Sequence, residues 1–211
     1  MSKENLISHN PDTLLQRPWR GPIEVPELLI PYYEGKVAVE IGFAAGDYIP
    51  IWAKHAKEFI GFESFTANMR PWFDMAQGRQ DLKRLDNISL LNQEISPEEV
   101  PEADFYYGSG LLPPIVEFVT RMKNVGKRGV FAWFSGFAKE DFTPEYKDSL
   151  KNIPERIISF DGEDYIDTGH FDQFCYFADE SISFNSKELD NRPVHDEMSM
   201  TNKCIISIKH L

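Results

Sequence analysis

The chain has 211 residues, 42% of them hydrophobic and 27% charged, which suits one sizeable core and is short for two independent domains. Its net charge of −12 makes a nucleic-acid partner an unfavoured expectation, because such proteins usually carry a basic face. The sequence has neither a secretory signal pattern nor an apolar run near the roughly 18 residues of a membrane span, so we expect a cytoplasmic protein without membrane contact.

The first 35 residues differ in composition from the rest. They contain five prolines and many polar side chains, which favours irregular structure with one short helix. Trp19 and the apolar run 28–30 suggest that this segment packs against the remainder of the protein. We therefore predict an N-terminal arm, 1–35, packed on a domain formed by 36–211.

From residue 37 onward, short apolar runs alternate with segments of helical spacing. The predicted strands are 37–41, 58–63, 88–91, 104–107 and 129–134. The predicted helices begin near Ile49, cover 67–83, and begin again at Pro114. Such alternation favours a mostly parallel sheet with helices on both faces.

The last third has a different pattern. Strands are predicted at 156–160, 171–177 and 204–208, with helical signal only near 143–150. This favours an antiparallel edge on the sheet. The polar stretch 179–203 is too long for a simple turn, and the sequence leaves open whether it is a functional lid or a mobile loop.

The strongest motif is Glu40-x-Gly42-x-x-x-Gly46, between the first strand and its helix. Gly42 permits a sharp turn, and we expect Gly46 to bring the helix start close to a ligand with no Cβ in the way. The next strand ends in Glu63, 17 residues after Gly46. An acid about 20 residues beyond such a loop binds ribose hydroxyls in nucleotide-binding folds.

A dinucleotide is the obvious competitor for this loop. Its fingerprint needs glycines at positions 44 and 47, which here are Ala44 and Asp47. A diphosphate would also lie badly beside Asp47 unless that side chain turned away. A cofactor with one carboxylate, one positive charge and no phosphate fits better, and S-adenosylmethionine is such a ligand.

Residues 37 to about 110 resemble the cofactor-binding half of class I S-adenosylmethionine-dependent methyltransferases. The segments 39–48 and 59–63 are similar to the tRNA guanine-N7 methyltransferases in particular, with Ala44 at the middle glycine of the family motif E/D-x-G-x-G-x-G. The resemblance implies an α/β, Rossmann-like three-layer sandwich, with a mostly parallel sheet of about seven strands and an antiparallel C-terminal strand. The cofactor-binding residues that we predict are Glu40, Gly42, Ala44, Gly46, Asp47, Glu63, Gln93, Glu94 and Ile95.

The resemblance ends where substrate chemistry begins. After the fourth strand, 107–114 lack the basic, proline-rich signature of the tRNA guanine-N7 enzymes, and the N/D-P-P-Y/F signature of adenine or glutamine amino-methylating enzymes is absent. Because methyl transfer needs alignment more than a protein nucleophile, catalytic motifs are weak in such enzymes. Asp104, Tyr107 and Ser109 are the catalytic candidates, ahead of Tyr106, Trp133, His170 and Asp172.

No metal site is expected, since the adjacent residues 195–197 (His-Asp-Glu) rarely converge on one ion. The first functional hypothesis is a methyltransferase acting on a small molecule. The alternatives are a non-catalytic S-adenosylmethionine-binding protein, an RNA methyltransferase, or another adenosyl-ligand enzyme, such as an aminopropyltransferase or a nucleotide-dependent oxidoreductase. A homodimer is left open.

Overall fold

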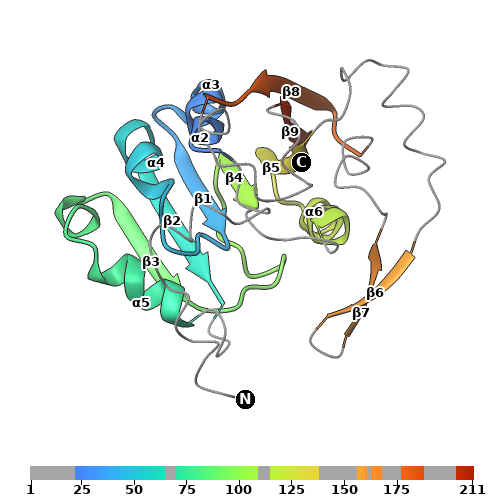
Figure 1. The fold of residues 1–211 in the computed structure, drawn as a ribbon, viewed down its shortest axis with the longest axis horizontal. Coiled ribbons are helices and arrows are strands. Elements are labelled where there is room, and N and C mark those ends of the chain that lie inside the picture. The colour runs from blue at the N-terminus through green and yellow to red at the C-terminus, as the bar shows by residue number, and fades with distance from the viewer. Residues whose placement is uncertain are drawn as a thin grey trace.

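In the computed structural model, the residues described are 22–64, 70–108, 115–137, 156–160, 163–167, 177–187 and 203–211. They form a seven-stranded sheet with the strand order β3-β2-β1-β4-β5-β9-β8 (Figure 1). The predicted α/β, Rossmann-like architecture is confirmed, including the number of strands.

Five neighbouring strands of this sheet are parallel. They are β1 (Val37–Ile41), β2 (Glu58–Glu63), β3 (Ile88–Asn92), β4 (Phe105–Gly108) and β5 (Val130–Phe137). The C-terminal β9 (Lys203–His210) runs antiparallel to β5, and β8 (Glu180–Asn185) runs antiparallel to β9 at the edge. The predicted antiparallel C-terminal strand is thus confirmed.

Helices cover the sheet on both faces. On the first face lie α2 (Glu24–Leu28), α3 (Ile30–Tyr33), α4 (Ile49–His55), α5 (Arg70–Gly78) and the short 3-10 helix η2 (Leu82–Arg84), and on the second face lies α6 (Ile115–Asn124). Strand residues alternate between two core clusters, so that Tyr107 belongs to the first and Tyr106 to the second. One cluster lies between the sheet and the helices of the first face, and the other lies between the sheet and α6, so the arrangement is a three-layer sandwich.

The described part of the N-terminal arm contributes to the first core. Val25 of α2, Leu29 between the two helices and Tyr33 of α3 have no exposed surface, and the Tyr33 ring lies at 4.8 Å from that of Trp52. These three side chains therefore belong to the same apolar core as residues of β1 and β4. The boundary at residue 35 stays a prediction.

The last third corrects the sequence interpretation. Residues 180–185, expected in a lid or loop, form β8, because Ser181-Ile182-Ser183-Phe184 alternates polar and apolar side chains with the period of a strand. The predicted strand 156–160 is confirmed as β6 (Arg156–Phe160), but it pairs with β7 (Glu163–Asp167) in a separate two-stranded sheet. The predicted helix 143–150 lies outside the described residues, as does the predicted strand 171–177 except Phe177, which is not in a strand.

Candidate cofactor site

The sheet has a topological switch point between β1 and β4. From β1 the chain proceeds through β2 to β3 on one side, and it then returns to β4 and β5 on the other. In open α/β sheets, ligands bind outside the carboxyl ends of the strands at such a point. The loop 42–48, which follows β1, lies at this end.

The loop alternates between left-handed and other backbone conformations. Gly42, Ala44 and Gly46 have φ values of 83°, 51° and 75°. Among the described residues, Ala44 is the one residue other than glycine with a positive φ. Its position is that of the middle glycine in the family motif, and a left-handed φ is the conformation that favours glycine there.

Glu63 ties the end of β2 to this loop. Its carboxylate accepts a hydrogen bond from the backbone N–H of Ala44 and a second, at 3.0 Å, from the N–H of Ser64. The residue is only 2% exposed. The predicted ribose-binding carboxylate therefore faces the glycine loop and not the far side of the sheet.

Asn92, at the end of β3, is a site residue that sequence reasoning missed. Its side-chain amide donates to the backbone carbonyls of Glu63 and Ser64, at 3.2 and 3.1 Å. An amide at the end of a strand that follows an acid-terminated strand was the available signal. Asn92 fixes the backbone from which the Glu63 carboxylate projects.

Gly46 has a packing role that the sequence did not predict. A Cβ on Gly46 would lie at 2.7 Å from Cδ1 of Ile49, 3.3 Å from Cδ1 of Leu82 and 3.4 Å from Cβ of Ala76. The missing Cβ thus makes room for α4, α5 and η2 behind the loop. The expectation that Gly46 also brings the helix start close to a ligand stays a prediction.

Asp47 faces a cation on the protein itself. Its carboxylate lies 3.2 Å from Nη1 of Arg79, which follows α5. The Asp47 side chain therefore points toward Arg79. From the sequence, a diphosphate was disfavoured unless this side chain turned away from it. That objection to a dinucleotide no longer applies.

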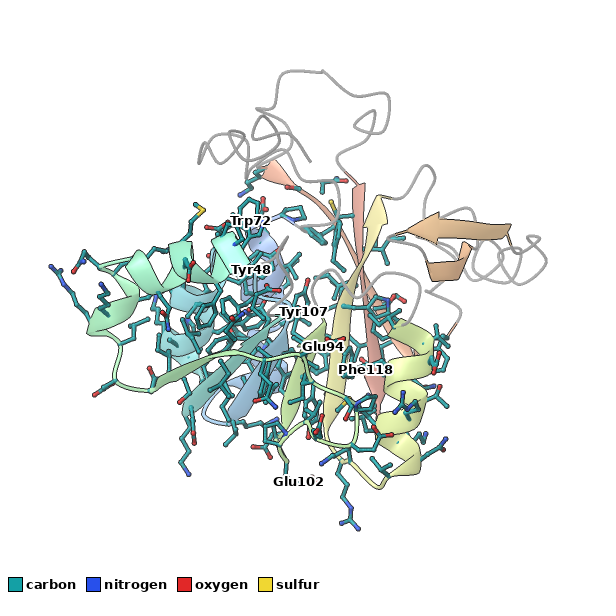
Figure 2. All side chains as sticks on the ribbon, turned by 90° about the horizontal axis from the view of Figure 1, so that it is seen from below. Tyr48, Trp72, Glu94, Glu102, Tyr107 and Phe118 are labelled. Carbon is teal, nitrogen blue, oxygen red and sulfur yellow. The ribbon has the colours of Figure 1, made fainter. Side chains whose placement is uncertain are left out.

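Glu40 is buried, as Glu63 is, and it bonds to the helix that follows the loop, while its predicted contact to the cofactor stays a prediction. It is 1% exposed, and Oε2 accepts a hydrogen bond of 2.9 Å from Nε1 of Trp52. The Tyr107 ring packs against Tyr48 and Trp52 at 5.9 and 5.4 Å, and it is also buried. The rings of Tyr48, Trp52 and Tyr107 form an aromatic layer under the loop, and Figure 2 labels Tyr48 and Tyr107.

The remaining candidates are divided between the two ends of the sheet. Gln93, Glu94 and Ile95 follow the carboxyl end of β3, where the first two are exposed and Ile95 is half-buried against the second core. Asp104 is at the opposite end: it precedes β4, and its carboxylate accepts a hydrogen bond from the N–H of Val37, which begins β1. In Figure 2, Glu102 marks that end, away from Tyr48 and Trp72. The structure does not bring Asp104 to the loop.

Several residues considered from the sequence fall outside the described ranges, namely Ser109, His170, Asp172 and 195–197. Within those ranges, no group of three or more His, Cys, Asp or Glu side chains is arranged to hold a metal ion. No helix among the described residues is long and apolar enough to cross a membrane.

Comparison with known proteins identifies the fold. No protein-family model matches the sequence, and no curated protein matches it. Among solved structures, a provisionally assigned O-methyltransferase from Klebsiella pneumoniae aligns with a TM-score of 0.55 and 12% identity, over 99% of this chain and 94% of that one.

Two further structures agree with this match. Precorrin 8W decarboxylase from Methanobacterium thermoautotrophicum aligns with a TM-score of 0.52 and 15% identity, over 96% of this chain and 95% of that one. The O-methyltransferase TomG from Streptomyces achromogenes, solved in complex with SAM, aligns with a TM-score of 0.52 and 10% identity, over 89% and 78%. At these identities the likeness establishes the shared fold.

Proposed function

We propose that this chain, which has the fold of class I S-adenosylmethionine-dependent methyltransferases, binds S-adenosylmethionine and transfers its methyl group to a small-molecule acceptor. The observation that carries the proposal is the buried carboxylate of Glu63, which faces the left-handed loop of Gly42, Ala44 and Gly46 at the switch point. This combination supports the proposal, because a carboxylate beside such a loop can accept hydrogen bonds from ribose hydroxyls.

The chemistry of the site fits an adenosyl ligand better than a dinucleotide. Glu63 supplies a carboxylate, which is the group that accepts hydrogen bonds from both hydroxyls of a ribose. A diphosphate binds best beside a positive charge that no carboxylate neutralises. Arg79 contacts the loop, but it already pairs with Asp47 and Asp81. In this proposal Gln93, Glu94 and Ile95, after β3, lie along the adenine.

The sulfonium methyl of the cofactor supplies the electrophile for a direct displacement. The protein then contributes alignment, and no residue has to form a covalent bond to the methyl group. Tyr107 supports the loop from within the aromatic layer. Ser109, which directly follows the carboxyl end of β4, is the proposed contact to the acceptor, and Asp104 is not part of this proposal because of its position.

Calorimetric titration with S-adenosylmethionine, S-adenosylhomocysteine and NAD tests the cofactor. We expect binding of both sulfur ligands and none of NAD. Because hydrogen bonds to a charged group contribute about 1.5–3 kcal/mol, Glu63→Gln is expected to weaken binding by about 10- to 100-fold. Glu58→Gln, at the exposed amino end of the same strand, is the matched control and is expected to change nothing. Binding of NAD alone would contradict the proposal.

A non-catalytic S-adenosylmethionine-binding protein is the second candidate. The position of Asp104 favours it, because that acidic side chain lies at the wrong end of the sheet to act as a base. Transfer of a labelled methyl group from S-adenosylmethionine into cell extract, followed by separation of small molecules from RNA, decides between the two. Label in the small-molecule fraction supports the methyltransferase, and ligand binding without any transfer supports the second candidate.

A further inference from the structure

Arg79 contacts the back of the loop after β1 from a distant part of the chain. It lies just beyond α5, and its Nη1 donates to the carbonyl of Ala45 at 3.3 Å, to the carbonyl of Gly46 at 3.0 Å and to Asp47 at 3.2 Å. The contacts join segments more than 30 residues apart in sequence. One guanidinium nitrogen thus holds three consecutive residues of the loop.

The other side of the same guanidinium is fixed by Asp81. Nε donates to Oδ1 at 3.1 Å and Nη2 to Oδ2 at 2.7 Å, which is the bidentate geometry of an arginine–carboxylate pair. Because a guanidinium is planar and rigid, this pair sets the direction in which Nη1 points. The hydrogen bond and charge of Asp81 also raise the pKa of Arg79.

Packing from the same segment reinforces these polar contacts. Ala76 and Leu82 lie where a Cβ on Gly46 would meet them. Trp72 and Ala45 form a buried cluster, with Ala44 and Met75 packed against it. The segment from α5 to η2 therefore supports the loop from behind, while Glu63 holds it through the Ala44 N–H.

We propose that Arg79 is a positioning residue for the cofactor loop. By binding the carbonyls of Ala45 and Gly46, it turns these acceptors toward α5 and fixes the alternating backbone that faces the ligand. A lysine in its place offers a point charge for Asp47 but not a fork that reaches Asp81 and the two carbonyls together. The effect on ligand affinity rests on the proposed function, whereas the effect on the loop backbone does not.

The test compares Arg79→Met and Arg79→Lys with a matched control, Arg121→Met. Arg121 is on α6, away from the loop, and it makes a similar bidentate pair with Glu98. Two quantities are measured in each full-length variant. The first is hydrogen exchange at the amides of Gly46 and Ile49, which bond to the carbonyls of Phe43 and Gly46. The second is the Kd for S-adenosylhomocysteine.

We expect Arg79→Met to speed exchange at both amides at least tenfold without ligand and to weaken S-adenosylhomocysteine at least tenfold. Arg79→Lys should recover part of both effects, and Arg121→Met should show neither. If Arg79→Met does not fold, Asp81→Asn is used in its place. That change weakens the bidentate pair that orients the guanidinium and keeps the pair of Arg79 with Asp47. Unchanged exchange and unchanged Kd would overturn the inference.

The two proposals fail separately. If the unaltered protein does not bind S-adenosylhomocysteine, the proposed function fails and the ligand-free exchange alone decides the role of Arg79. If the unaltered protein binds the ligand and Arg79→Met binds it equally well, the proposed function stands and the role of Arg79 in affinity is refuted.

Discussion

Two positions of the loop, Ala44 and Gly46, depend on backbone geometry in different ways. Ala44 has a left-handed φ of 51°, which costs an L-residue about 1–2 kcal/mol. Gly46 has a φ of 75° and lies where a Cβ would meet Ile49. The sequence located both positions through the motif. The packing of α5 and η2 behind Gly46 was not predicted, because it is not visible in a local pattern.

Replacing Ala44 by glycine relieves the left-handed strain and adds flexibility to the unfolded chain. Since the second effect offsets part of the first, we expect the free energy of unfolding to rise by up to about 1 kcal/mol. Ala45→Gly is the control. Ala45 does not share the positive φ and is buried, so this change is expected to destabilise by about 1 kcal/mol. Urea denaturation measures both, and equal losses in the two variants would refute the strain.

Gly46→Ala adds a methyl group where the nearest atom, Cδ1 of Ile49, is 2.7 Å away. Together with the left-handed φ, this is expected to destabilise the protein by about 1–3 kcal/mol. Ile49→Val removes that Cδ1, so the double variant should lose less stability than the two single changes summed. A double-mutant cycle by chemical denaturation measures the difference, and strict additivity would show that the Gly46–Ile49 contact is not the cause.

At the scale of elements, β8 is held at the edge of the sheet by polar contacts as well as by its ladder. Glu180 accepts a hydrogen bond of 3.0 Å from the Tyr32 hydroxyl of α3 and lies within 2.5 Å of Nε2 of His210 on β9. Ser186 and the N–H of Lys187 bond to Glu24 of α2. The strand therefore joins the N-terminal helices to the C-terminal strand.

The hydrogen bonds from His210 and then Tyr32 lower the pKa of Glu180 below its ordinary value of 4.5. A carboxyl group whose pKa falls on folding stabilises the protein above its ordinary pKa, and that stabilisation is lost as the pH falls through the lowered value. Because both side chains of the pair are half-exposed, we expect less than about 1 kcal/mol at pH 7.

Thermal unfolding of Glu180→Gln from pH 7 to pH 3 measures this contribution. The unaltered protein should have the higher Tm at pH 7, and the two curves should converge on acidification. Glu117→Gln, an exposed partner of Arg121 on α6, should follow the unaltered protein at every pH. A difference between Glu180→Gln and the unaltered protein that persists at pH 3 would contradict the account.

The elements that the sequence predicted well are those with long apolar runs. The strands β1, β2 and β6 have their predicted bounds, because each is a continuous or alternating apolar segment between clear breaks. In contrast, β8 has only Ile182 and Phe184 among polar residues, and β7 is mostly acidic. The partner of β8 is β9, which lies beyond the intervening residues 186–202, whereas β7 directly follows its partner β6 and was missed because its own residues are mostly acidic.

For the whole molecule, the alternation of strands and helices predicted the fold, and the motif with Glu63 predicted which loop and carboxylate lie together at the switch point. The direction of each side chain was not predictable, because it depends on contacts between elements far apart. Asn92 ties β3 to β2, and Arg79 ties α5 to the loop. Asp104 was wrongly predicted to lie at the site. It precedes β4, at the amino ends of the parallel strands, whereas the loop and Glu63 lie at their carboxyl ends.

The central claim is that Glu63 and the loop of 42–46 bind an adenosyl ligand at the switch point. A crystal structure with S-adenosylhomocysteine tests it most directly. The account predicts that the two ribose hydroxyls lie within hydrogen-bond distance of the Glu63 carboxylate, with the loop backbone in its present left-handed alternation. A ligand bound elsewhere, with the Glu63 carboxylate making no contact to the sugar, would contradict it.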